Sequence, residues 1–356
     1  MKRILTSAPG KLHLLGEHTV VHNKPAIIAA VDKRCFVEIT PRTDKVIKII
    51  SRNYKKEITT DFPRIIKLFR EAEANYAKYI KDNDMVLLKS ITKGTLTYPL
   101  LIIGQFINYF NLQSIPGFDL KINSEIPSGA GMGSSSALAV AMIGALCLFQ
   151  GFDFDKKIIN QIAYLCEQKK HGRPSGGDNA ASCFGGMIWF KKDAYSGKAK
   201  MRPLGITIPK NILKNFYMVN TGAPKETTGE MVSLVRDLLK KNPELTRNIF
   251  IDQEKQVKKL SAALKLGNSD QIIEIIKKGE ENLENLGVVS PFVQKIIRQI
   301  EDSGGVAKIC GGGGVKKGTG MLLVYHQNFK SLTNVLKSYQ LTIEQLILGA
   351  EGLREE

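Results

Sequence analysis

The spacing of apolar and polar residues predicts strands and helices that follow one another along the whole chain. Residues 118–122 alternate apolar and polar side chains, which indicates a strand. Residues 135–149 form an unbroken apolar segment rich in alanine, which predicts a helix buried on all sides. Residues 155–169 place their apolar side chains on one helical face, and Asp61 followed by Pro63 is typical of a helix start.

A change of character after Asp193 divides the chain into two parts. Before it, residues 2–7 predict a strand that ends in a Pro9-Gly10 turn. Residues 194–200 are polar and contain glycine, which indicates a linker. Further strand-like or helical segments cover residues 25–40, 185–190, 216–220, 226–300, 306–310 and 321–325. Because 356 residues exceed what one core usually holds, we predict two domains, 1–193 and 194–356.

The net charge is large, with 51 Lys and Arg against 34 Asp and Glu, or +17. The lysines are spread along the chain without interleaved aromatic residues, so we expect a basic surface that attracts anions and no nucleic-acid binding. No apolar run approaches the ~20 residues that cross a bilayer, and the apolar start stops at Thr6, so we expect a cytoplasmic protein without a membrane partner. The five cysteines form no CxxC pair, which favours buried, reduced thiols.

A loop rich in glycine and serine precedes the apolar helix. It reads Pro-Ser-Gly-Ala-Gly-Met-Gly-Ser-Ser-Ser over residues 127–136. Small residues let backbone N–H groups approach an anion, and the N-terminus of the following helix carries a partial positive charge. The loop lacks the Gly-Lys-Ser/Thr of a Walker A motif and the acidic residue of a dinucleotide fingerprint. It therefore predicts a phosphate site, with a simple turn of the chain as the alternative.

A second motif reads Glu-Gln-Lys-Lys-His-Gly-Arg-Pro-Ser-Gly-Gly-Asp-Asn over residues 167–179. Glu167 lies near the end of a predicted helix and Asp178 in the loop after it, so the two carboxylates can converge on one cation. Mg²⁺ is held by one or two carboxylates together with water and phosphate oxygens. The alternative is a helix end followed by a turn, with Asp178 capping the next segment.

Two further segments suit an anion site. Lys11 follows Pro9-Gly10, and a lysine beside a transferring phosphoryl group supplies positive charge where negative charge develops. An ordinary strand-turn-strand would look the same. Residues 311–320 form a glycine-rich loop between two predicted strands, which either closes over a ligand or is a surface hairpin.

These four features, in this order, resemble the GHMP kinase superfamily, named for galactokinase, homoserine kinase, mevalonate kinase and phosphomevalonate kinase. The loop at 127–136 is similar to the family's ATP-phosphate loop, and the Ala-Pro-Gly-Lys opening and late glycine loop are similar to its first and third motifs. The implied fold class is α+β with two domains. The N-terminal one is a βαβ domain like ribosomal protein S5, the C-terminal one is ferredoxin-like, and the site lies in the cleft between them.

Within the superfamily, the motifs are most similar to those of the mevalonate kinase family. Residues 16–22 resemble its Gly-Glu-His-x-Val-Val-x-Gly, and residues 167–179 match its Glu-x-x-x-His-Gly-x-Pro-Ser-Gly-x-Asp-Asn. A galactokinase would carry aspartate in place of Val20. The resemblance implies phosphorylation of mevalonate by ATP in isoprenoid biosynthesis, with another GHMP kinase, such as phosphomevalonate kinase, as the alternative.

The resemblance also implies a role for each motif residue. Asp178 would be the general base or orient the acceptor hydroxyl, and Lys11 would lower the pKa of that hydroxyl. Ser135 and Glu167 would hold Mg²⁺. The residues implied to cradle ATP are Pro127, Gly129, Ala130, Gly131, Met132, Gly133, Ser134 and Ser135. Those implied to lie beside the acceptor are Glu17, His18, Thr19 and Thr221. The resemblance is also compatible with a homodimer.

Two features depart from the family pattern. Residues 54–93 carry no motif that aligns, although this segment often shapes substrate access. The third loop reads Gly-Gly-Gly-Gly-Val-Lys-Lys-Gly-Thr-Gly in place of Gly-Ala-Gly-Gly-Gly-Gly-Cys. Its Lys316 and Lys317 either contact phosphate, of ATP or of a phosphorylated acceptor, or keep a surface hairpin soluble. A GHMP-fold protein without activity is a further alternative, against which Lys11 and Asp178 argue.

Overall fold

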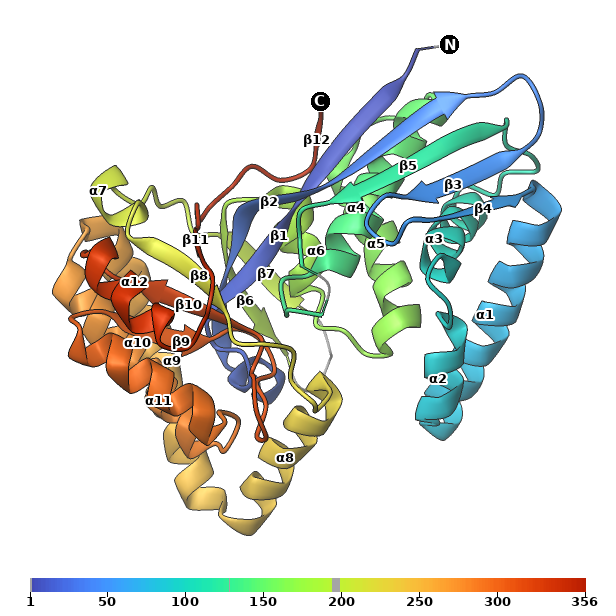
Figure 1. Ribbon diagram of the computed structural model, residues 1–356. Helices are drawn as coiled ribbons and strands as arrows, with labels where there is room; N and C mark the ends of the chain where they lie inside the picture. The colour runs from blue at the N-terminus through green and yellow to red at the C-terminus, as the bar shows by residue number, and fades with distance from the viewer. Residues whose placement is uncertain (1, 128, 194–198) are drawn as a thin grey trace.

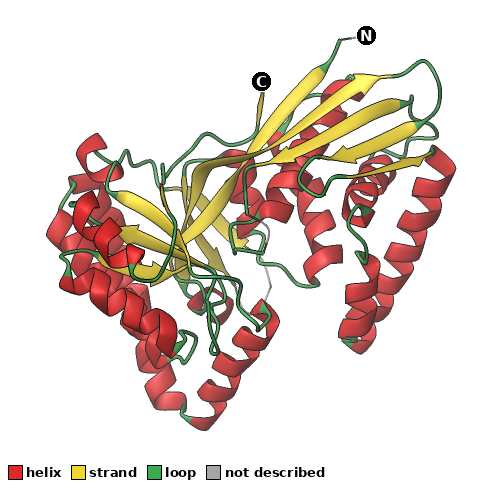
Figure 2. Ribbon diagram, viewed as in Figure 1, coloured by secondary structure: helices red, strands yellow, loops and turns green. Residues whose placement is uncertain are grey.

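The computed structural model describes residues 2–127, 129–193 and 199–356, and its strands form two sheets (Figures 1 and 2). The strands of the larger sheet are β1 (Ile4–Leu15), β2 (Pro25–Pro41), β3 (Ile47–Ser51), β4 (Lys56–Thr60), β5 (Phe118–Ser124), β6 (Met187–Lys192), β7 (Ala199–Pro203) and β12 (Arg354–Glu355). Among the described residues its main path is β12-β1-β2-β5-β3-β4, with β6 paired to β2 and β7 to β6. β3 and β5 are parallel, and the other pairs are antiparallel.

Strand β1 is longer than the sequence predicts. We expected a turn at Pro9-Gly10, but the strand continues to Leu15, and its register against β2 shifts between Pro9 and Lys11 and again between His13 and Leu15. A β-bulge accommodates the proline, which cannot donate to the ladder. Gly10 allows a close approach, because a side chain there would lie 3.0 Å from the carbonyl oxygen of Met132. The bulge therefore brings the glycine loop against β1, and the Lys11 amide donates to that carbonyl at 2.9 Å.

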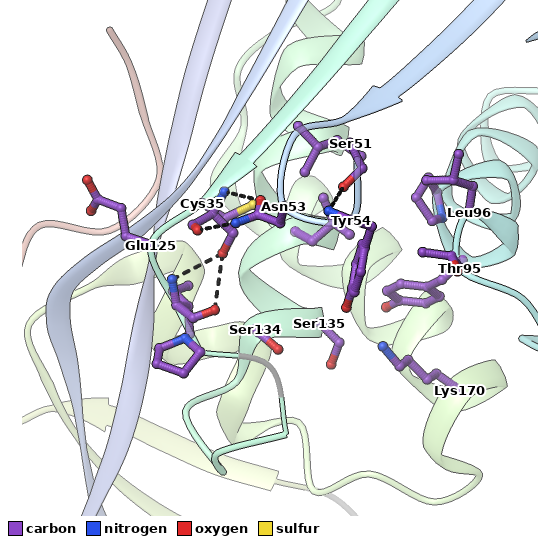
Figure 3. A pocket seen from close by; sticks show the side chains of 17 residues that line it. Cys35, Ser51, Asn53, Tyr54, Thr95, Leu96, Glu125, Ser134, Ser135 and Lys170 are labelled. Atoms are coloured by element: carbon purple, nitrogen blue, oxygen red, sulfur yellow. Dashed lines mark hydrogen bonds between the residues drawn. The ribbon is translucent and has the colours of Figure 1, made fainter. Parts of the chain in front are cut away.

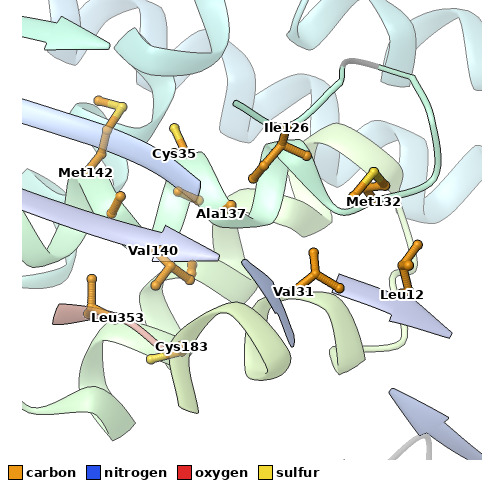
Figure 4. Close-up of a cluster of buried hydrophobic side chains, with 14 of the residues drawn as sticks. Leu12, Val31, Cys35, Ile126, Met132, Ala137, Val140, Met142, Cys183 and Leu353 are labelled. Carbon is orange, nitrogen blue, oxygen red and sulfur yellow. The ribbon is translucent and has the colours of Figure 1, made fainter. Parts of the chain in front are cut away.

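Helix α4 (Ser134–Gln150) forms the centre of the layer on the larger sheet. It packs against β1 and β2, and its neighbours are α3, α5 and α6. Figure 4 shows its apolar side chains among those of the two strands. The other helices of this half are α1 (Phe62–Asp82), α2 (Met85–Ile91), α3 (Thr97–Tyr109), α5 (Lys156–His171), α6 (Gly177–Phe184) and a 3₁₀ turn at Thr19–His22. The helices predicted at 135–149 and 155–169 are confirmed, and Asp61 caps α1 as expected.

The smaller sheet has the strand order of a ferredoxin-like domain. Its described strands run β11-β8-β10-β9, all antiparallel, where β8 is Phe216–Asn220, β9 Val306–Ile309, β10 Met321–Tyr325 and β11 Ile343–Gln345. The helices of this half are α7 (Lys210–Leu213), α8 (Thr228–Lys241), α9 (Pro243–Leu266), α10 (Ser269–Asn285), α11 (Pro291–Asp302) and α12 (Phe329–Lys337). If β8, β9, β10 and β11 are numbered 1 to 4 in chain order, they lie side by side in the order 4-1-3-2. This order confirms the ferredoxin-like prediction. None of the described helices combines the length and apolar character needed to cross a bilayer.

The C-terminal segment returns to the larger sheet, where β12 pairs with β1 (Figure 1). Arg34 is buried there and donates to the carbonyl oxygens of Glu351 and Gly352, each at 2.7 Å, and to Ser7 Oγ at 2.6 Å. Strand β7 joins the same sheet. Residues 194–198 of the predicted linker lie outside the described residues, and 199–200 begin β7. The division at 193/194 remains a prediction, with two later strands contributing to the first sheet.

The cysteines fulfil the expectation of reduced, buried thiols. All five lie in the described part of the chain, and each is free and buried: Cys35, Cys147, Cys166, Cys183 and Cys310. Burial raises the pKa of each thiol, which disfavours the reactive thiolate.

Candidate active site

The glycine loop connects β5 to α4 and alternates anchored and exposed residues. Ala130 and Met132 are buried, whereas Gly129 and Gly131 are exposed. Gly133 has φ +69° and forms the N-terminal cap of α4, a backbone conformation that favours glycine. A side chain at Gly133 would also lie 2.9 Å from Lys11 Cγ. The loop therefore presents bare backbone to solvent at a helix N-terminus, directly against Lys11.

Lys11 forms an ion pair with Asp178 from the start of α6, with 3.1 Å between Nζ and Oδ1. The lysine side chain is only 4% exposed, whereas that of Asp178 is 37% exposed and reaches the open side of the site. His13, two residues along β1 and so on the same face, places Nδ1 3.4 Å from Lys11 Nζ. The structure thus brings the two predicted catalytic residues together and adds a histidine that the sequence analysis did not identify.

Burial and charge set the protonation states of this group. Burial, followed by the charge of Lys11, lowers the pKa of His13 to about 3, so the imidazole is neutral and Nδ1 accepts from the lysine. Burial alone would raise the pKa of Asp178. The charge of Lys11 and the hydrogen bond from its ammonium act in the opposite direction, and the pKa of Asp178 lies below its ordinary value. The site therefore holds a carboxylate beside a lysine.

Glu167 of α5 also lies beside Ser135, which is in the first turn of α4 after the glycine loop. Ser135 Oγ donates to Glu167 Oε2 at 3.1 Å, and Ser136 Oγ donates to the same oxygen at 2.6 Å. The other carboxylate oxygen accepts from the Tyr98 hydroxyl at 2.5 Å. His171 Nε2 lies 3.2 Å from Ser135 Oγ. Glu167 is buried, so this set of donors fixes where its carboxylate lies.

Glu17 lies in a buried ion pair that joins the two halves of the protein. Its Oε1 accepts from Lys308 of β9, which also donates to the carbonyl oxygens of His13, at 3.3 Å, and Ile309. Glu280 of α10 lies beside them and accepts from the Ile309 amide at 3.0 Å. Burial raises the pKa of Glu280 well above its ordinary value. The second oxygen of Glu17 is buried and has no hydrogen-bond partner among the described residues.

The other residues predicted beside the acceptor all make contacts within the protein. His18 Nε2 donates to the Gly312 carbonyl at 3.0 Å, and its buried Nδ1 has no partner in the described chain. Burial lowers the pKa of His18 to about 4, so it is neutral. Thr19 is buried and its hydroxyl donates to the Gly16 carbonyl at 3.5 Å. Thr221 Oγ1 donates to the Gly320 carbonyl at 2.8 Å, so it anchors the third loop.

The third loop is packed into the site rather than extended as a free hairpin. Gly131 of the first loop lies against it, because a side chain at Gly131 would be 3.1 Å from the Cys310 carbonyl oxygen. Gly314 forms a bridge with Val289. Lys316 and Lys317 are exposed; the Lys317 carbonyl accepts from Ser290, and the charge of Lys316 contributes to lowering the pKa of Glu230, after the hydrogen bonds from Thr227.

A cavity of about 270 Å³ extends from the start of α4 toward the turn between β3 and β4 (Figure 3). Ser134 and Ser135 line it from the start of α4, Tyr54 from the β3–β4 turn and Lys170 from α5. Asn53 ties that turn to β5, because its side-chain amide and the Ser124 backbone exchange two hydrogen bonds of 2.7 Å. Tyr54 is the residue by which the segment without a family motif contributes to this cavity.

Sequence reasoning missed His13, Tyr98, Lys170 and Lys308. His13 had a usable signal, since it alternates with Lys11 once the strand is taken to continue, and so had Lys170, which follows Glu167 by three residues in the second motif. Tyr98 and Lys308 reach the site from distant positions, and no local spacing marks them.

Comparison with known proteins agrees with this geometry. Residues 98–186 match the family of GHMP kinases at its N terminal domain. The chain is 30% identical to the mevalonate kinase of Archaeoglobus fulgidus over 313 residues, 87% of this chain and 89% of that protein. It is 32% identical to the mevalonate kinase of Pyrococcus furiosus over 288 residues, 81% of this chain and 75% of that protein.

The fold agrees over a still larger share of the chain. A solved mevalonate kinase structure superposes with a TM-score of 0.78 at 24% identity, over 98% of this chain and 100% of that chain. Since the similarity in sequence and in fold extends over most of the length, this chain belongs to the mevalonate kinase family of GHMP kinases.

Proposed function

We propose that the protein transfers the γ-phosphoryl group of ATP to the hydroxyl of mevalonate and forms 5-phosphomevalonate. The observation that carries the proposal is the Lys11–Asp178 pair, 3.1 Å apart and held against the glycine loop by Gly133. A carboxylate and an ammonium at this spacing act on an attacking hydroxyl and on the phosphoryl oxygens beside it. The family membership supports mevalonate as the acceptor.

The nucleotide fits the glycine loop and the cavity beside it. The exposed Gly129 and Gly131 backbone and the N-terminus of α4 suit the phosphates. The cavity leads away from that point between α4 and the β3–β4 turn, and we assign it to the nucleoside. Tyr54 at its far end offers an aromatic face for a base.

Ser135 and Glu167 fit a magnesium ion. Their oxygens are 3.1 Å apart, close to the roughly 2.9 Å between neighbouring ligands of an octahedral ion with Mg–O distances of about 2.0–2.1 Å. Ser136 and Tyr98 hold the carboxylate in place if the Ser135 hydroxyl hydrogen turns away. A bound Mg²⁺ would neutralise charge on the phosphates.

Asp178 would orient the acceptor hydroxyl and take its proton late. Phosphoryl transfer has a loose transition state, so the hydroxyl need not lose its proton before attack. A carboxylate of lowered pKa is a weak base but a good hydrogen-bond acceptor, which suits this order of events. Lys11 keeps Asp178 ionised, and its ammonium offsets the charge that develops on the transferring oxygens.

Glu17 and His18 suit the acceptor side of the site. Glu17 Oε2 and His18 Nδ1 are buried polar atoms without partners among the described residues. Such atoms normally find a partner in a ligand or in water. Both residues follow β1 beyond Lys11, so hydroxyl groups of an acceptor bound near Asp178 would satisfy them.

The proposal is tested by following ATP consumption with mevalonate, phosphomevalonate, galactose and homoserine as acceptors. We expect turnover with mevalonate and its loss in Asp178→Asn. Preference for phosphomevalonate would overturn the acceptor assignment, and equal ATP consumption with and without any acceptor would overturn the transferase assignment.

A further inference from the structure

We propose that Lys170 is the cation that binds the phosphates of the nucleotide and thereby selects a nucleoside polyphosphate over a free nucleoside. The inference rests on the proposed function and deepens it. Lys170 lies in the last turn of α5 and lines the cavity together with Ser134 and Ser135 (Figure 3). It stands one turn from Glu167 and hence on the same helical face.

The ammonium of Lys170 makes no hydrogen bond or salt bridge with the described residues. The ammonium lies over the ring of Tyr98, with Nζ 4.3 Å from the ring centroid. The adjacent Lys169 differs: it donates to Gln105 at 2.7 Å and to Glu73 at 2.5 Å. Lys169 is therefore occupied inside the protein, whereas the Lys170 ammonium has no hydrogen-bond acceptor among the described residues and can donate to a ligand.

Placing Lys170 here is unfavourable without an anion. Burial lowers the pKa of Lys170, although the charge of Glu167 partly offsets this. The cation–π contact holds the ammonium in position, and Tyr98 is itself fixed by its hydrogen bond to Glu167. The lysine is thus preset beside the Ser135–Glu167 pair, and an anion in the cavity would satisfy it.

The neighbouring groups indicate a phosphate chain as that anion. Ser134 and Ser135 begin α4, so backbone N–H groups and the partial charge of the helix face the same end of the cavity. Lys316 and Lys317, which the sequence made candidates for this role, are exposed and do not line the cavity. Lys170 is the lysine that lines the cavity.

The test is calorimetric binding of ADP and of adenosine to wild type, Lys170→Met and Lys170→Arg. Methionine keeps the packing on Tyr98 and removes the charge. We expect Lys170→Met to weaken ADP binding roughly 10- to 100-fold, the range of a hydrogen bond to a charged group, and to leave adenosine binding unchanged. Arginine should retain most of the ADP affinity. Lys157→Met is the matched control, because Lys157 is an exposed lysine on the same helix.

Two results would overturn the inference. An ADP affinity in Lys170→Met within about twofold of wild type would show that the lysine does not contact the phosphates. An equal loss of ADP and adenosine affinity would show that it only supports the cavity wall. If wild type binds neither ADP nor ATP, the proposed function fails together with the inference. If wild type binds ADP and only the expected effect of Lys170→Met is missing, the inference fails alone.

Discussion

Replacing Lys308 with methionine should destabilise the protein strongly. The lysine side chain is fully buried and its partner Glu17 is 2% exposed, so the substitution leaves a carboxylate without its cation in the interior. At a hydrogen-bonding separation of about 3 Å and an effective dielectric of about 20, the lost attraction is roughly 5 kcal/mol. Breaking a buried pair from one side costs about 3–5 kcal/mol in unfolding free energy. We expect a loss in that range for Lys308→Met.

The assay is urea unfolding at one pH and ionic strength, for wild type, Lys308→Met, Glu17→Gln and the double variant. The double variant should recover most of the loss, because no buried charge remains unpaired. Lys258→Met is the control, since Lys258 is 63% exposed in its 2.8 Å pair with Glu254 and should cost less than about 1 kcal/mol. A double variant as unstable as Lys308→Met would refute the electrostatic reasoning, and so would a loss below about 1 kcal/mol in Lys308→Met.

Four further predictions concern the site. Asp178→Asn should lower kcat by about 10²–10⁴-fold while ATP affinity, measured in the same preparation, persists; an unchanged kcat removes Asp178 from the mechanism. Glu167→Gln should raise the Mg²⁺ concentration for half-maximal activity more than Ser135→Ala does, because it removes a charge; equal values in wild type and both variants would disprove the assignment. His18→Ala should raise KM for mevalonate and spare KM for ATP, and the reverse would place it on the nucleotide side. Burial, followed by the charge of Lys11, lowers the pKa of His13 from its ordinary 6.5 to about 3 in the folded protein. As the pH falls below 6.5, the unfolded chain therefore binds a proton at His13 that the folded protein does not bind, and the folded protein loses stability. From pH 6.5 to 5 this loss is roughly 2 kcal/mol, and His13→Leu should lose less; equal urea midpoint shifts in the two proteins would contradict this.

Elements whose side chains meet one kind of environment were predictable from the sequence. The apolar run of α4 and the alternation of β5 determine the elements almost by themselves, because burial on all sides or on one face leaves a regular pattern. Strand β1 was cut short in the prediction, because Pro9 and Gly10 are typical turn residues. In the fold the same two residues form a bulge, which is a property of the pairing with β2 and of the approaching loop. Strand β12 is too short to leave a pattern.

The candidate site was predictable where its parts lie within one motif. The positions of Lys11, Asp178, Ser135 and Glu167 followed from local spacing and from the family resemblance, although their roles remain predictions. Tyr98 was not predictable, since its contact with Glu167 spans 69 residues and depends on the packing of two helices. Lys170 lies within the second motif at a position that the family pattern leaves open, so the lysines of the third loop drew attention that it did not.

The return of the C-terminal segment to β1 has a consequence for the order in which the protein can fold. Residues 351–355 supply two carbonyl oxygens that accept from the buried Arg34, and they include β12, the strand that pairs with the edge of β1. A ribosome makes them only after the entire smaller sheet and its helices. The first half of a nascent chain therefore lacks two of the acceptors of the Arg34 guanidinium and has an open strand edge, which is a template for pairing with other chains. Its completion depends on the last half having emerged, so the two halves mature together although each has its own sheet.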